Sequence, residues 1–105
     1  SVFLESSNTQ DLLTIHEIVK SLPNSPGKKS NEFYFDISTL LKNIKTFYSY
    51  QGSMTTPPCQ EGVRWIVVKE PLIISDNQYS KFVNIYHNNS RPNQPLYNRL
   101  VHEHP

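Results

Sequence analysis

Apolar residues recur at helical spacing in the first quarter of the chain. A helix is therefore predicted within residues 8–22, with an apolar face made of Leu12, Ile15, Val19 and Leu22. Asn8 or Thr9 is expected to cap this helix, and Pro23 is expected to end it. A loop follows over residues 23–30, which are rich in proline, glycine and serine.

Two further helical segments are indicated by a polar cap followed by apolar residues. A brief turn is predicted at residues 36–43, where Asp36 is the cap and the inward residues are Ile37, Leu40 and Leu41. A longer helix is predicted over residues 75–86, where Ser75 is the cap and one face carries Tyr79, Phe82 and Tyr86.

Strands are predicted where aromatic and β-branched residues alternate with polar ones or form short apolar runs. The clearest are residues 46–52 and 63–72, and shorter ones are expected at 2–4, 33–35 and 99–103. The chain is thus predicted to be α+β, mainly β, and to form one domain over residues 1–105. Because these apolar strands need neighbours, part of their sheet is expected to lie outside the chain.

Composition narrows the class of protein without naming a function. Hydrophobic residues make up 36% and aromatic residues 11% of the 105 residues, which favours a packed core over disorder. The net charge of +1 gives no general attraction to nucleic acid or to a membrane surface. No apolar run approaches the roughly 20 residues of a membrane span. The single cysteine, Cys59, is either a small buried residue or half of a disulfide whose partner lies outside the chain.

The four histidines do not form an obvious metal site. His16 falls within the first predicted helix and is expected to be solvated, and His87 lies at the end of the last helix, where a cation suits the helix dipole. His102 and His104 are two positions apart, which on a strand places both rings on one face, as a pair of metal ligands requires. No third ligand accompanies them, so no metal site is predicted within the chain. Paired carboxylates, a phosphate loop and a nucleophile elbow are not evident either.

The stretch GSMTTPPCQEGVRW, residues 52–65, has the strongest potential for chemistry. Thr55 and Thr56 offer two hydroxyls, and the two prolines that follow restrict the backbone and remove two donors. Val63 and Trp65 would then lie on one face of the next strand. The residues suggest a polar shelf beside an apolar wall, although an ordinary turn that leads into a buried strand has the same pattern.

Three stretches of the chain together resemble the α-class carbonic anhydrases. They are YSYQGSMTTPPCQEGVRWIVVKEPL, the helix over residues 75–86, and NNSRPNQPLYNRLV, while the segment SVFLESS and the helix after it resemble the elements that precede these motifs. The resemblance covers residues 1–101. It implies the C-terminal portion of the α-carbonic anhydrase fold, a central, twisted, largely antiparallel sheet with short surface helices.

The resemblance implies a zinc enzyme that reversibly hydrates carbon dioxide to bicarbonate. The family's three zinc histidines, and the acid that orients its key threonine, would lie before Ser1, so no metal ligand is expected in this chain. The chain is therefore expected to be under half of a complete domain, and to be inactive and without zinc when alone. The alternative is a catalytically inactive, carbonic-anhydrase-like binding or structural module that lacks the metal. The intact threonine pair and apolar wall favour the enzyme.

The resemblance also assigns roles to individual residues. Thr55 matches the catalytic threonine that accepts a hydrogen bond from the zinc-bound hydroxide and donates its own proton to the acid. The substrate-binding residues would be Met54, Thr55, Thr56, Val63 and Trp65, with Met54 in place of a leucine and Gly62 in place of a bulkier residue. Structural roles are implied for Tyr50, Pro57, Pro58, Cys59, Arg91 and Arg99, with a cis bond between the two prolines.

The partners implied by the resemblance are carbon dioxide and bicarbonate, sulfonamide-type or anion inhibitors, and the missing N-terminal segment. Cys59 would form a disulfide with that segment, which favours a secreted, extracellular or periplasmic location. Residues 88–90 also match the three-residue pattern of an N-glycosylation acceptor at Asn88. Neither nucleic acid nor a membrane span is expected.

Overall fold

The computed structural model describes residues 1–23, 25, 27 and 36–105. The chain divides into two compact units, the first formed by Ser1–Phe3, Ile44–Pro71 and Asn89–Pro105, and the second by Leu4–Asn43 and Leu72–Asn88. The strand expected at residues 33–35 and much of the loop expected at 23–30 lie outside the described residues.

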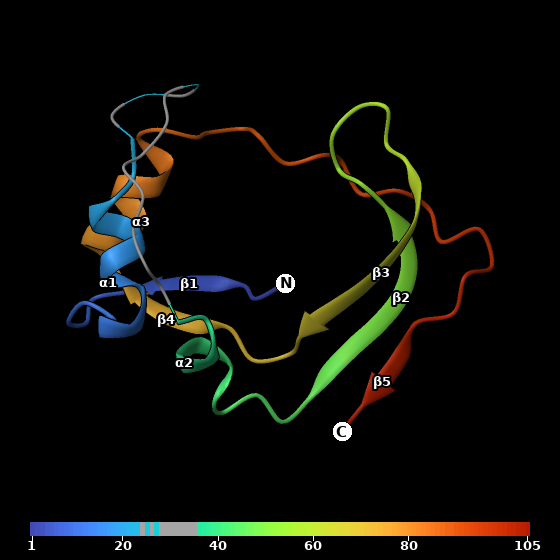
Figure 1. Cartoon of the computed structure of the whole chain (residues 1–105), viewed down its shortest axis with the longest axis horizontal. Helices are drawn as coiled ribbons and strands as arrows, with labels where there is room; N and C mark the ends of the chain where they lie inside the picture. Colours follow the sequence, from blue (N-terminus) through green and yellow to red (C-terminus); the bar gives the residue numbers. More distant parts are fainter. Residues whose placement is uncertain (24, 26, 28–35) are drawn as a thin grey trace. The chain divides into compact units, whose positions relative to one another are not determined.

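The first unit is built on a three-stranded sheet in the order β3-β2-β5 (Figure 1). Strand β2 (Phe47–Ser53) pairs antiparallel with β3 (Glu61–Val68) on one edge and with β5 (His102–His104) on the other. The two long predicted strands are confirmed as a hairpin, but β3 covers residues 61–68 instead of 63–72. Strand β5 lies further along the chain than the predicted residues 99–103.

The register of the hairpin decides which residues share a face of the sheet. Tyr50 lies opposite Trp65, and Gly52 lies opposite Val63, so these four residues belong to one face. The register shifts between Gly52 and Ser53, where Ser53 pairs with Glu61. Such a bulge interrupts the regular ladder of backbone hydrogen bonds at the point where the chain leaves the hairpin.

Two further contacts hold the edges of this sheet. The amino group of Ser1 donates to the carbonyl oxygen of Ile66 at 2.7 Å, and the N–H of Val68 donates to the carbonyl oxygen of Ser1 at 3.0 Å. At β5, Lys69 forms an ion pair with Glu103. Many large apolar side chains of this unit are nevertheless exposed, including Phe3, Ile66, Leu96 and Leu100.

The described residues of the second unit form a two-stranded sheet and three helices. Strand β1 (Leu4–Ser7) pairs in parallel with β4 (Leu72–Ser75), and the helices are α1 (Leu13–Lys20), α2 (Ser38–Leu41) and α3 (Asp76–Val83). Its core contains Ile15, Val19 and Ile74, and the half-buried side chains packed against it are Leu12, Leu40 and Phe82. The predicted strand at residues 2–4 lies at 4–7 instead, and β4 was not predicted as a separate strand.

The start of α1 differs from the prediction because its first backbone donor finds a partner far away in the sequence. The helix begins at Leu13 and has no side-chain cap from its own N-terminal segment, so the expected caps Asn8 and Thr9 are wrong. The N–H of Leu12 instead donates to the side-chain oxygen of Gln78 at 2.9 Å. A donor at a helix start must be satisfied, and here α3 provides the acceptor.

The cap of α3 is confirmed, whereas its predicted aromatic face is only partly correct. The Ser75 hydroxyl accepts from the N–H of Gln78 at 3.0 Å, and the Gln78 side chain accepts from the N–H of Ser75 at 3.2 Å, which completes a capping box. Phe82 packs against the core, but Tyr79 and Tyr86 are exposed. The fully buried residue of this helix is the polar Gln78.

The short helix α2 follows the predicted cap but not the predicted packing. The carboxylate of Asp36 accepts from the N–H of Ser38 at 3.0 Å. Hydrogen bonding from the side chain of Ser38, and then from this N–H, lowers the pKa of Asp36. Leu40 packs against the core, whereas Ile37 and Leu41 are exposed, so their inward orientation is corrected. No helix among the described residues is long and apolar enough to cross a membrane.

Candidate functional site

The loop between β2 and β3 is closed by its own backbone hydrogen bonds. The N–H of Met54 donates to the carbonyl oxygen of Gln60, and the N–H of Cys59 donates to that of Thr56, each at 2.8 Å. The peptide bond between Pro57 and Pro58 is cis, as predicted. The sequence therefore produces a compact turn that presents its side chains outward.

The two threonine hydroxyls are available for contacts beyond the described residues. Thr55 and Thr56 are both exposed, and neither hydroxyl makes a hydrogen bond within residues 1–23, 25, 27 and 36–105. Met54 is 48% exposed, and several other large apolar side chains of the first unit are exposed as well. Cys59 is half-buried and has a free thiol, with a left-handed φ of 57°.

Trp65 forms an apolar wall beside this loop, and Gly52 makes room for it. The indole N–H of Trp65 donates to the carbonyl oxygen of Ser53 at 3.0 Å. A Cβ atom at position 52 would lie 2.9 Å from Cδ1 and 3.2 Å from Nε1 of Trp65. The indole ring therefore lies directly against the backbone of Gly52. Val63 is half-buried opposite Gly52, on the same face as Trp65.

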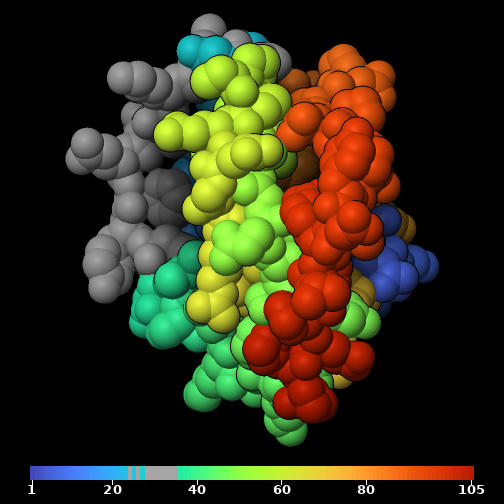
Figure 2. All heavy atoms as spheres, turned by 90° about the vertical axis from the view of Figure 1, so that its right-hand side faces the viewer, coloured from blue at the N-terminus to red at the C-terminus, as the bar shows by residue number. Residues whose placement is uncertain are grey.

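Two arginines of the C-terminal segment bind the hairpin. Figure 2 shows this segment, orange to red, alongside the green to yellow β2–β3 hairpin. Arg91 donates from Nη1 to the hydroxyl of Ser53 at 3.0 Å, and that hydroxyl donates to the carbonyl oxygen of Met54 at 3.0 Å. Arg91 thus reaches the residue that directly precedes the Met54–Thr55 pair.

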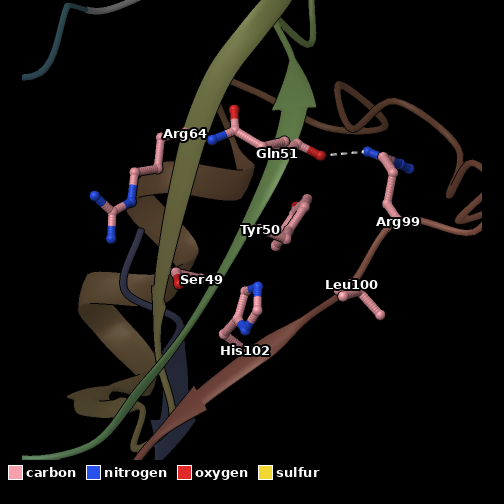
Figure 3. A pocket seen from close by; sticks show the side chains of 7 residues that line it. All are labelled: Ser49, Tyr50, Gln51, Arg64, Arg99, Leu100 and His102. Carbon is pink, nitrogen blue, oxygen red and sulfur yellow. Dashed lines mark hydrogen bonds between the residues drawn. The ribbon is translucent and has the colours of Figure 1, made fainter.

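Arg99 holds the same segment through three backbone carbonyl oxygens. Its guanidinium donates to Gln51 at 2.7 Å, and to the carbonyls of Leu96 at 2.8 Å and Pro95 at 2.9 Å. The guanidinium carbon also lies 6.0 Å from the centre of the Tyr50 ring. Figure 3 shows the bond from Arg99 to the backbone of Gln51. The structural roles predicted for Tyr50, Arg91 and Arg99 stay predictions.

A cavity of about 570 Å³ brings together part of the predicted site. Its lining includes Tyr50, Thr55, Trp65, Arg91 and Arg99, and does not include Met54, Thr56 or Val63. A second cleft of about 410 Å³ lies beside the end of the β2–β5 pairing (Figure 3), lined by Ser49, Tyr50, Gln51, Arg64, Arg99, Leu100 and His102.

The described residues do not fit a zinc ion. No group of three or more His, Cys, Asp or Glu side chains within them is placed to hold a metal. His102 and His104 do lie on one strand, as the spacing predicted. However, Nε2 of His104 is hydrogen-bonded to the Ser49 hydroxyl at 2.8 Å, and its ring stacks on Phe47 with centroids 4.4 Å apart. His16 and His87 are exposed in the other unit.

Gly52 and Ser53 are the site residues that sequence reasoning missed. The glycine accommodates the indole ring, while the serine accepts hydrogen bonds from both Trp65 and Arg91. Only one feature of the sequence points to these two residues, and it does so weakly: a glycine lies within a predicted strand, next to a loop. Such a glycine often marks a bulge or a close approach, and both occur here.

Comparison with known proteins matches the whole chain to one protein family. The sequence pattern of the family described as "Eukaryotic-type carbonic anhydrase" matches residues 1–105. A carbonic anhydrase from Nostoc is 38% identical over 104 residues, which are 97% of this chain and 39% of that protein. One from Neisseria gonorrhoeae is 39% identical over 104 residues, which are 98% of this chain and 40% of that protein.

Solved structures agree with these sequence matches. The α-carbonic anhydrase from Thermovibrio ammonificans, in complex with the inhibitor sulfanilamide, is 39% identical, with a TM-score of 0.82 over 95% of this chain and 44% of its own. The α-carbonic anhydrase from Photobacterium profundum is 35% identical, with a TM-score of 0.81 over 95% of this chain and 46% of its own. The chain thus spans less than half the length of these four relatives.

Proposed function

Because the chain belongs to the family of eukaryotic-type, or α-class, carbonic anhydrases, we propose that it forms part of a zinc-dependent enzyme for the reversible hydration of carbon dioxide. The observation that carries the proposal is the loop of Thr55. It presents two hydroxyls without partners among the described residues, and Thr55 lines the same cavity as Trp65. A polar group beside an apolar surface suits a small apolar substrate that becomes an anion.

The roles proposed for the residues follow from their chemistry. Thr55 is the catalytic residue, because its hydroxyl can donate one hydrogen bond and accept another at the point where the substrate reacts. Met54, Val63 and Trp65 supply apolar surface for carbon dioxide, and the hydroxyl of Thr56 supplies a polar contact for bicarbonate. The zinc ligands are proposed to come from outside the described residues, because these residues do not fit the metal.

Further parts of the proposal concern partners and location. Sulfonamide-type or anion inhibitors are proposed to bind at the same loop, which is supported by the sulfanilamide complex of the Thermovibrio relative. Cys59 is half-buried with a free thiol, and we propose that it pairs with a cysteine outside this chain in a secreted, extracellular or periplasmic protein.

The proposed function can be tested in a chimeric enzyme in which a relative supplies the rest of the domain. The chain replaces the segment that it matches in the Nostoc carbonic anhydrase, and zinc content and carbon dioxide hydration are measured. The expected result is one zinc per molecule and clear activity, whereas the 105-residue chain alone gives neither. A folded, zinc-loaded chimera without activity would exclude the proposed contribution and favour an inactive module.

Substitution of Thr55 then tests its individual role. Thr55→Ala in the chimera should lower kcat by roughly a hundredfold or more, because one preorganised hydrogen-bonding group is lost at the reacting atoms. Thr55→Ser keeps the hydroxyl and should retain most of the activity. Equal activity of Thr55→Ala and the unsubstituted chimera, at equal zinc content, would contradict the assignment.

A further inference from the structure

Ser53 lies at the point where the regular hairpin ends and the Thr55 loop begins. The register shift between Gly52 and Ser53 disturbs the ladder at this residue. Side chains supply hydrogen bonds here instead: the indole N–H of Trp65 to the Ser53 carbonyl, and Nη1 of Arg91 to the Ser53 hydroxyl. The position of the loop relative to the sheet therefore depends on two long-range contacts.

Two hydrogen bonds in series link Arg91 to the carbonyl of Met54, and a separate bond holds Met54 across the loop. Arg91 donates to the Ser53 hydroxyl at 3.0 Å, and this hydroxyl donates to the carbonyl oxygen of Met54 at 3.0 Å. The N–H of Met54 in turn donates to Gln60 across the loop at 2.8 Å. Because a charged donor binds the serine oxygen, the hydroxyl proton is directed toward Met54, whose carbonyl is bonded to the nitrogen of Thr55.

The guanidinium of Arg91 has no competing carboxylate partner in the part of the chain that the structure describes. The ion pair found there joins Lys69 and Glu103. Arg91 is half-buried and lines the same cavity of about 570 Å³ as Thr55 and Trp65. The positive charge of Arg91 therefore lies next to Ser53, where the loop begins, and the Arg91 side chain donates a hydrogen bond to that residue.

We propose that Arg91 and Ser53 act as a positioning pair that sets the location of the Thr55 hydroxyl. The inference rests on the proposed function for its catalytic consequence, but the structural effect on the loop can be measured independently. Loss of the pair should leave the fold and zinc content intact and misplace the catalytic threonine. Small displacements of a catalytic group reduce the rate more than they reduce substrate binding.

The test uses the intact, zinc-loaded protein with Arg91→Gln, Arg91→Lys and Ser53→Ala. The matched control is Arg64→Gln, since Arg64 is exposed on β3 and its side chain makes no hydrogen bond within the described residues. Arg91→Gln and Ser53→Ala should lower kcat roughly 10- to 100-fold, the range of one hydrogen bond to a charged group, with a smaller change in KM. Arg91→Lys keeps a charged donor and should recover part of the rate.

Hydrogen exchange provides a measurement that does not depend on activity. The amide of Met54 should exchange faster in Arg91→Gln and Ser53→Ala than in the unsubstituted protein, while Arg64→Gln leaves it unchanged. The two changes act on one chain of bonds, so the double variant should be no slower in kcat than the slower single variant.

Each outcome decides the proposal. It is overturned if Arg91→Gln and Arg64→Gln have the same kcat within twofold and the same loop exchange. If Arg91→Gln fails to fold, Arg91→Lys and Ser53→Ala decide by the same two readouts. If the unsubstituted protein neither hydrates carbon dioxide nor binds sulfanilamide, the proposed function fails, and the exchange of Met54 alone decides whether the pair positions the loop.

Discussion

Substitution of Gly52 by alanine should destabilise the protein through a single, identifiable clash. The added Cβ would lie 2.9 Å from Cδ1 and 3.2 Å from Nε1 of Trp65, and 3.2 Å from Cε2 of Tyr50. These atoms belong to rigid rings, so the rings must move. Gly52 itself is not among the residues with positive φ, which means that alanine fits the backbone.

Three terms determine the size of the effect. Overpacking costs about 1–3 kcal/mol, and loss of the indole hydrogen bond to Ser53 costs roughly 0.5–1.5 kcal/mol. Against these, alanine in a strand is favoured over glycine by roughly 0.5–1 kcal/mol. Together these terms predict a net loss of roughly 0.5–4 kcal/mol in the free energy of unfolding.

Denaturant unfolding of the intact protein measures this loss, and a second background identifies its cause. In a Trp65→Phe protein the ring is smaller and no indole N–H exists, so Gly52→Ala should cost much less there. Gly62→Ala is the contrasting control, because a Cβ at Gly62 meets nothing within 4 Å and acts only through its φ of +90°. Equal cost of Gly52→Ala with tryptophan or phenylalanine at position 65 would refute the clash.

Three further predictions concern the second unit. Gln78→Leu should cost about 1–3 kcal/mol, measured by denaturant unfolding, because it removes the partner of the half-buried N–H and carbonyl of Leu12 and of the buried N–H of Ser75; an unchanged midpoint would contradict this. Ser75→Ala should cost about 0.5–2 kcal/mol through the lost cap, and Ser75→Thr, which keeps a hydroxyl that can accept from Gln78 and donate to Asp11, should restore most of it. Hydrogen bonds from Ser38 lower the pKa of Asp36, so ionised Asp36 should stabilise α2 near neutral pH. This stabilisation should be lost as the pH falls through the pKa of Asp36 in the folded protein. An Asp36 pKa at or above its ordinary value in an NMR titration would contradict this prediction.

The parts of the fold that follow from local pattern could be predicted from the sequence. The hairpin strands were predicted at residues 46–52 and 63–72, close to the observed β2 and β3, and the cap at Ser75 was visible as a serine before a polar helix start. The family fold implied by the motifs is confirmed by the solved relatives. The start of α1 could not be found in this way, because the acceptor for Leu12 is Gln78, 66 residues later.

In the candidate site, too, residues that are contiguous in the sequence could be recognised, whereas contacts between distant residues could not. The threonines, the cis proline pair and the wall residue Trp65 were evident as a contiguous motif. The contact between Arg91 and Ser53 spans 38 residues, and nothing in the residues between them indicates it. Strand β4 was missed for a related reason: a short apolar run after Pro71 gives no sign that its partner is the distant β1.

The contacts that hold the Thr55 loop in place can be distinguished from the chemistry proposed for it. The contacts that hold Ser53 and the loop come from β2, β3 and the segment around Arg91, all within the first unit. The hydroxyls of Thr55 and Thr56 make no hydrogen bond among the described residues, and the groups that they contact in the proposed function remain a proposal. If the loop is positioned by this chain's own residues, its geometry should not depend on which metal-bearing segment completes the site. The Nostoc chimera and the intact protein should then show the same slow exchange at Met54, and faster exchange in the chimera alone would show that the missing groups help to position the loop.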